Sequence, residues 1–74
     1  MPHISIKHFP AELTNEKKHE LMNRITQAIR KTFDCNESVI SISLEAIQPE
    51  VWQEKVYQPE IKDKWHMLCK IPNY

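Results

Sequence analysis

The chain has 74 residues and contains no glycine. Glycine-rich phosphate loops and dinucleotide-binding fingerprints need a backbone that approaches the phosphates closely, which glycine permits. We therefore expect no nucleotide cofactor. Two-residue β-hairpins usually need residues with positive φ and are also disfavoured. Connections between strands should be longer, or should run through helices.

Long apolar runs and an excess of one charge are missing too. No apolar stretch approaches the roughly 20 residues of a membrane-spanning helix, and no signal-peptide core follows the N-terminus. Ten acidic and ten basic residues cancel, so the charge gives no reason to expect nucleic acid as a partner. The two cysteines, Cys35 and Cys69, lack a metal-ligand spacing and are interpreted as thiols in a reducing cytoplasm. We expect a cytoplasmic protein with neither membrane nor nucleic-acid partners.

The four histidines are His3, His8, His19 and His66. Their spacings match no metal-ligand pattern, and alternation along a strand puts His3 and His8 on opposite faces. No metal is expected.

A chain of 74 residues forms one domain, here residues 1–74. Such a chain buries only about 60% of its unfolded surface, so it often needs a disulfide, a metal or a partner subunit. With the first two disfavoured, self-association remains. A homodimer is favoured and a hexamer stays possible.

Two segments alternate between apolar and polar residues, as half-buried strands do. In residues 2–9, Ile4 and Ile6 share a face with Pro2 and His8. In residues 38–45, Ile40, Ile42 and Leu44 share a face, and Val39 lies on the other face with the polar residues. Between them, residues 14–33 show helical spacing, with Thr14 as a candidate N-cap. This order predicts a β-α-β unit with parallel strands and a right-handed crossover.

The C-terminal third predicts a short helical turn at residues 50–52 and a second helix over residues 59–70. Pro59 suits the first turn of a helix, and Ile61, Trp65 and Leu68 would share one face. The fold class is α/β, more narrowly α+β. One such unit exposes too much sheet to stand alone, so two subunits are expected to share a four-stranded sheet.

Proline is the second residue, directly before the first strand. If Met1 is removed, the chain begins with a secondary amine, and an α-amino group has a reference pKa of about 7.7–8.0. Burial in an apolar pocket would lower that pKa, so the amine could act as a general base. The alternative is purely structural, because proline suits the first position of a strand.

Together these segments resemble the 4-oxalocrotonate tautomerase family from Pro2 to about Trp52. The proline strand start, the long helix and the strand over residues 38–45 carry the likeness. Residues 2–10, 41–44 and 47–52 resemble its PptA-type branch, in which a second helix replaces a glycine-rich C-terminal hairpin.

The resemblance implies a cofactor-free enol–keto tautomerase, an isomerase. Pro2 would be the general base, and Trp52 would be the aromatic wall that excludes water. Familiar members bind a dicarboxylate with two arginines, but here the loop after the first strand has none and Ile40 stands in the second strand. A phenylpyruvate-like enol or another small 2-oxo acid enol therefore suits this chain better than a dianion.

The residue that replaces the arginines is left open. His8 shares a strand face with Pro2 and could donate a hydrogen bond to the substrate, or it could simply be a polar residue near a strand end. Lys7 and Lys55 are further candidates. A rival hypothesis is an inactive protein of the same fold that acts in binding or assembly, because a retained Met1 would convert the proline nitrogen into an amide.

Overall fold

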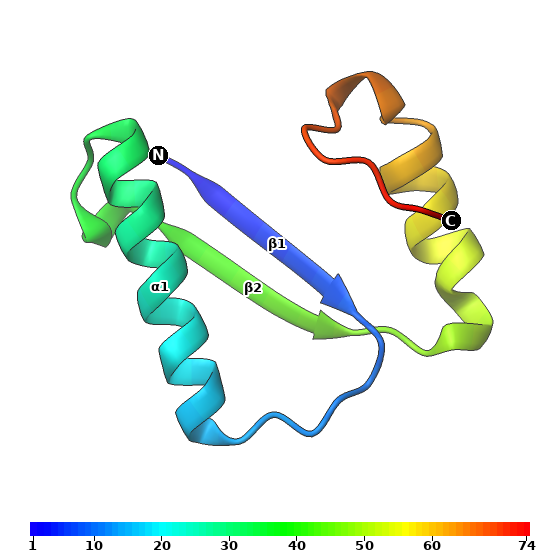
Figure 1. Cartoon of the computed structure of the whole chain (residues 1–74), viewed down its shortest axis with the longest axis horizontal. Coiled ribbons are helices and arrows are strands. Elements are labelled where there is room, and N and C mark those ends of the chain that lie inside the picture. Colours follow the sequence, from blue (N-terminus) through cyan, green and yellow to red (C-terminus); the bar gives the residue numbers. More distant parts are fainter.

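The computed structural model describes residues 1–74 and contains the predicted β-α-β unit. Strand β1 (His3–His8) and strand β2 (Ser41–Ala46) form a two-stranded parallel sheet. The register pairs His3 with Ser41 and continues to His8 with Ala46. Helix α1 (Asn15–Phe33) connects them (Figure 1). The tautomerase-like arrangement expected from the sequence is confirmed.

Strand β2 begins later than predicted because a 3₁₀ turn, η1 (Glu37–Val39), precedes it. The side chain of Asn36 accepts a hydrogen bond from the backbone N–H of Ser38 at 2.9 Å. This local bond draws the chain into a turn instead of an extended strand.

Helix α1 begins and ends at residues whose side chains and dihedrals suit those positions. Thr14 is the N-cap, and its hydroxyl accepts from the N–H of Lys17 at 3.1 Å. Asp34 ends the helix in the left-handed region at φ 50°, where its N–H donates to the carbonyl of Arg30. Glycine usually takes such a position, and aspartate is among the few other residues that tolerate it.

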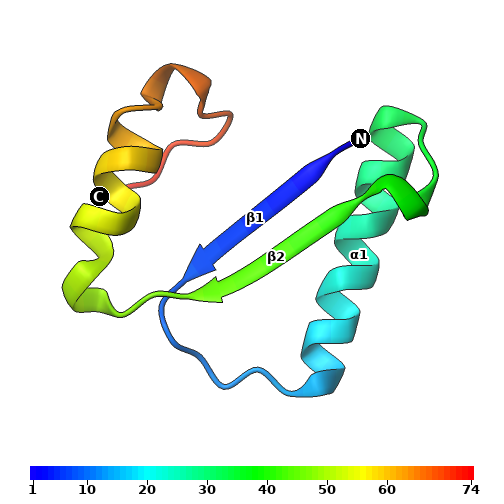
Figure 2. The same ribbon diagram turned by 180° about the vertical axis from the view of Figure 1, so that it is seen from behind.

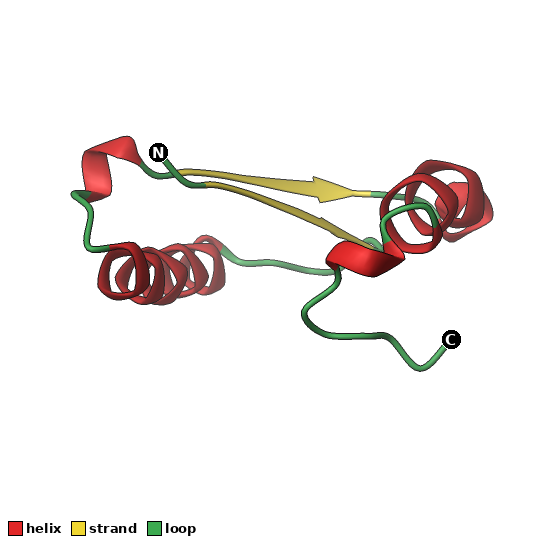
Figure 3. Cartoon of the chain, turned by 90° about the horizontal axis from the view of Figure 1, so that it is seen from above, coloured by secondary structure: helices red, strands yellow, loops and turns green.

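One face of the sheet is covered and the other is open. Seen along the sheet in Figure 3, α1 lies on one side of the strands only. The half-buried residues of the strands alternate with exposed ones, so Ile4, Ile6, Ile42 and Leu44 share one face. The opposite face carries polar residues, and the Nδ1 of His3 is 2.7 Å from the hydroxyl of Ser41 there.

The second helix differs from the prediction. It is a wide π-type helix, η3 (Gln53–Lys62), which follows a short 3₁₀ turn, η2 (Pro49–Val51), and contains Pro59 in its interior. Proline has no N–H to give, and a widened helix is a common way to accommodate such an interruption. The predicted helix over residues 59–70 is therefore wrong, and only the short turn η4 (Trp65–Met67) follows.

The position of the buried residues explains this difference. Val56 in η3 is one of only two buried residues, and the other is Ile47, just after β2. Ile61, Trp65 and Leu68, which were expected to share one helix face, do not lie on one helix. Trp65 is 47% exposed. Burial of Val56 thus stabilises a helix over Gln53–Lys62 and not one that extends to residue 70.

A C-terminal arm, residues 49–74, extends beyond the ends of the strands (Figure 2). The whole chain exposes 6215 Å², whereas a compact monomer of this mass exposes about 4,800 Å². Its radius of gyration is 14.0 Å, against about 11 Å for a compact chain of this length. The surface in excess, about 1,400 Å², is more than one partner buries in a typical protein interface.

No helix combines the length and the apolar character needed to cross a membrane.

Candidate functional site

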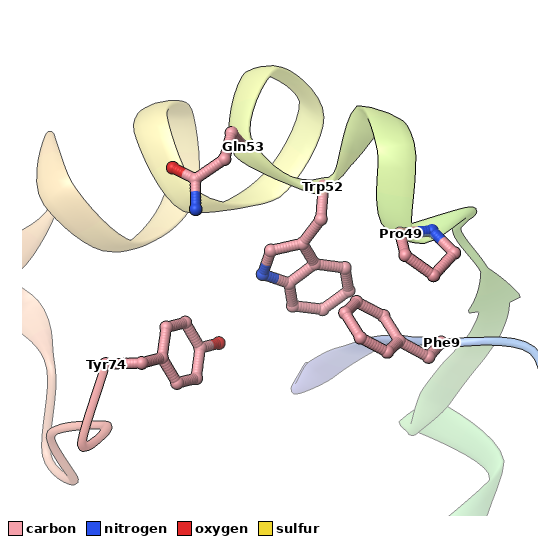
Figure 4. A pocket seen from close by; sticks show the side chains of 5 residues that line it. All are labelled: Phe9, Pro49, Trp52, Gln53 and Tyr74. Atoms are coloured by element: carbon pink, nitrogen blue, oxygen red, sulfur yellow. The ribbon is translucent and has the colours of Figure 1, made fainter.

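A cavity of about 440 Å³ lies where the C-terminal arm meets the end of β1. Its lining is mostly aromatic or apolar and consists of Phe9, Pro49, Trp52, Gln53 and Tyr74 (Figure 4). This volume is within the usual range for small-molecule sites, and a few polar groups in an apolar wall are typical of them. The cavity is the best candidate for a ligand site.

Two aromatic rings form the base of this cavity. Phe9 follows β1 directly, and its ring meets that of Trp52 edge-to-face, with centroids 5.0 Å apart and an interplanar angle of 90°. Such pairs are stabilised by the charge distribution of the rings in addition to their buried area. Pro49 occupies the first turn of η2, and Trp52 follows at the end of this turn, where its ring contacts Phe9.

An ion pair fixes η3 against β1 beside these rings. The ammonium of Lys7 donates to a carboxylate oxygen of Glu60. The hydrogen bond to Glu60 raises the pKa of Lys7 above its ordinary 10.5, partial desolvation opposes it, and Glu45 adds a smaller increase. Lys7 is therefore paired within the protomer, which leaves it less available to a substrate.

Pro2 lies far from this cavity in the same protomer. It is half-buried at the start of β1, and its carbonyl accepts a hydrogen bond from the N–H of Ser41 at 3.2 Å. Phe9 lies seven residues further along, and at about 3.3 Å per residue the two ends are about 23 Å apart. The predicted base and Trp52 thus occupy opposite ends of the strand.

His8 lies at the same strand end as the cavity but on the other face. Its Nδ1 is 2.6 Å from the carbonyl oxygen of Phe9, so Nδ1 donates and Nε2 is left as an acceptor in the neutral ring. The side chain lines a smaller cavity of about 190 Å³ beneath the sheet, with Lys18 among its neighbours. Within one protomer, His8 and Trp52 do not share a cavity.

The sequence did not indicate Gln53 or Tyr74 as site residues. Tyr74 is the last residue of the chain and reaches the cavity only because the arm folds back along η3. No spacing pattern in the sequence connects it to Trp52. Phe9, which comes where β1 ends, was the one member that strand alternation could have identified.

The structure brings together no three His, Cys, Asp or Glu side chains that could hold a metal ion. The side chains that line the aromatic cavity are aromatic, apolar or uncharged polar ones.

Comparisons with known proteins identify the family of this chain. Residues 2–56 match the tautomerase family, described as tautomerase enzymes. Over all 74 residues the chain is 45% identical to Tautomerase PptA of Escherichia coli O127:H6 and 38% identical to Tautomerase PptA of Pectobacterium atrosepticum. It is 36% identical to the protein of the same name in Pectobacterium carotovorum, and it spans 97% of each relative. The chain belongs to the tautomerase family, and with that membership goes an isomerase-type activity.

Proposed function

We propose that the chain is a cofactor-free enol–keto tautomerase in which Pro2, freed of Met1, is the general base. Its secondary amine would take the proton of the substrate's enol hydroxyl group and deliver a proton to the carbon conjugated with the new carbonyl. Such transfer is efficient when the base has a pKa near the working pH, and the reference pKa of an α-amino group is about 7.7–8.0.

We also propose a cytoplasmic location. The free thiols at Cys35 and Cys69 are compatible with a reducing cytoplasm.

A site that contains both Pro2 and Trp52 requires two subunits. β1 has an unpaired edge, since the sheet contains only β1 and β2. If two β1 strands pair antiparallel about a two-fold axis, the start of one strand meets the end of the other. Pro2 of the partner subunit would then lie beside Phe9 and Trp52. This pairing also creates the shared four-stranded sheet and covers part of the excess surface.

The same pairing brings Pro2 of the partner subunit close to the strand end where His8 lies, on the face opposite the aromatic cavity. His8 remains our candidate for a side chain that hydrogen-bonds to the substrate, through Nε2, because Nδ1 is occupied by the carbonyl of Phe9. The aromatic cavity and the lack of arginines favour a phenylpyruvate-like enol or another small 2-oxo acid enol over a dianion. The aromatic cavity beside the end of β1 is the observation that carries this proposal.

The test is ketonisation of phenylenolpyruvate by the processed protein, followed by ultraviolet absorbance. Pro2→Ala replaces the ring-held secondary amine by a freely rotating primary amine, so the base is no longer positioned and kcat/KM should fall by about 100-fold or more. Pro10→Ala, in the exposed loop, should leave kcat/KM unchanged. A chain with an uncleaved N-terminal extension keeps every side chain, but the nitrogen of Pro2 is then part of a peptide bond. This chain should be inactive. Equal rates for the wild type and Pro2→Ala would exclude proline from the mechanism.

The second candidate function is a tautomerase-fold protein that serves in binding or assembly without turnover. The observation in its favour is the absence of arginine from the loop after β1 and from position 40, which is isoleucine. It would hold if Met1 is retained, because an amide nitrogen cannot accept the proton. A processed protein that forms dimers, binds the substrate and does not turn it over would support this second function.

A further inference from the structure

We propose that Tyr74, with Gln53, determines the specificity of the aromatic cavity by binding a polar substituent at the far end of the ligand. This inference rests on the proposed function for the identity of the reaction, although not for binding itself. It concerns the end of the cavity remote from the position assigned to Pro2 of the partner subunit.

Apart from the indole N–H of Trp52, the cavity has two polar side-chain groups, and both lie on one side of it. In Figure 4, Phe9 is on one side of Trp52, and the hydroxyl of Tyr74 and the carboxamide of Gln53 are on the other. Neither of these groups makes a hydrogen bond within the chain. A ligand ring on Trp52 would therefore meet donors and acceptors only at its distal end.

Tyr74 is held in place although it is the terminal residue. Its ring lies 5.8 Å from that of Tyr57 in η3, at an interplanar angle of 40°. Its side of the cavity is not closed off, since Tyr74 is 64% exposed. The ring is thus positioned by an aromatic contact while its hydroxyl remains accessible to a ligand.

The chemistry of the site selects a flat ring with a hydrogen-bonding group at its far end. Aromatic faces accept any flat apolar ring, so they discriminate weakly between ligands with and without a hydroxyl group. The hydroxyl of Tyr74 or the carboxamide of Gln53 would form one more hydrogen bond with a hydroxylated ligand than with its unhydroxylated analogue. One such bond raises the affinity about fivefold. Tyr74 is therefore assigned as a specificity residue, not a catalytic one.

The test measures binding without turnover. In a Trp65→Phe background Trp52 is the only tryptophan, so its fluorescence reports on the cavity. The probes are 4-hydroxyphenylacetate and phenylacetate, which differ by one hydroxyl group. Tyr74→Phe should weaken binding of the hydroxylated probe about fivefold and leave phenylacetate unchanged. Tyr57→Phe, which keeps the supporting ring but lies outside the cavity lining, should affect neither probe.

An equal effect of Tyr74→Phe on both probes, no effect on either, or no binding of either probe would overturn the assignment. Kinetics separate it from the proposed function. Tyr74→Phe should raise KM for the enol of the hydroxylated aryl substrate and preserve kcat, whereas Pro2→Ala should lower kcat. If the wild type binds the probes with the expected difference but does not catalyse ketonisation, the proposed function fails and the role of Tyr74 stands.

Discussion

Mixing two inactive variants should restore activity if each site uses Pro2 from one subunit and Trp52 from the other. The distance of about 23 Å along β1 separates these residues within a protomer. In a heterodimer of Pro2→Ala and Trp52→Ala chains, one site carries both lesions and the other carries neither. Random pairing of equal amounts makes half of the dimers heterodimers, so about a quarter of wild-type activity should return.

The assay is ketonisation after the two variants are unfolded together and refolded as a 1:1 mixture. Each variant refolded alone gives the residual activity, and refolded wild type gives the recovery. Intact-mass analysis under native conditions measures the heterodimer fraction. Activity no higher than the mean of the two variants, with heterodimers present, would refute the composite site, because a site within one protomer would always carry one lesion.

Three further predictions concern the scaffold. Glu60→Gln keeps a carbonyl acceptor but removes the negative charge that pairs with Lys7 and raises its pKa, so it should lower the free energy of unfolding below pH 10.5. This difference should fade as the pH rises through the raised pKa, where Lys7 loses its charge in the wild type. Glu54→Gln on the same helix, where no ion pair is present, is the control, and an undiminished difference at high pH would contradict the assignment. Asp34→Gly should stabilise the chain by up to about 1 kcal/mol in urea unfolding, because glycine removes the cost of positive φ; a loss of stability would show that the aspartate side chain matters more than the backbone. Thr14→Ala should cost about 1 kcal/mol by the same assay, through loss of the N-cap, and an unchanged unfolding midpoint would show that the cap contributes nothing.

The β-α-β unit could be predicted because its signals are local. Alternation at Ile4 and Ile6 and the cap at Thr14 each determine structure within a few residues. The second helix could not be predicted in the same way. Pro59 indicated a helix start, but burial of Val56 fixed an earlier and wider helix that runs through it.

The candidate site was predictable only in part, for a related reason. Trp52 lines the aromatic cavity, and its contact with Phe9 joins segments far apart in the chain. Tyr74 reaches the cavity through a fold-back that no sequence pattern encodes. The separation of Pro2 from Trp52 likewise emerges only when the strand is built, and it turns the expected shared sheet into a requirement of the proposed mechanism.

The central claim is that a proline amine at the head of the chain performs the chemistry. Intact-mass spectrometry of the protein purified from its native host tests this most directly. We predict a mass lower than that of the 74-residue chain by one methionine residue, with proline first and unmodified. A mass that includes Met1 would contradict the claim, since the nitrogen would then be part of a peptide bond.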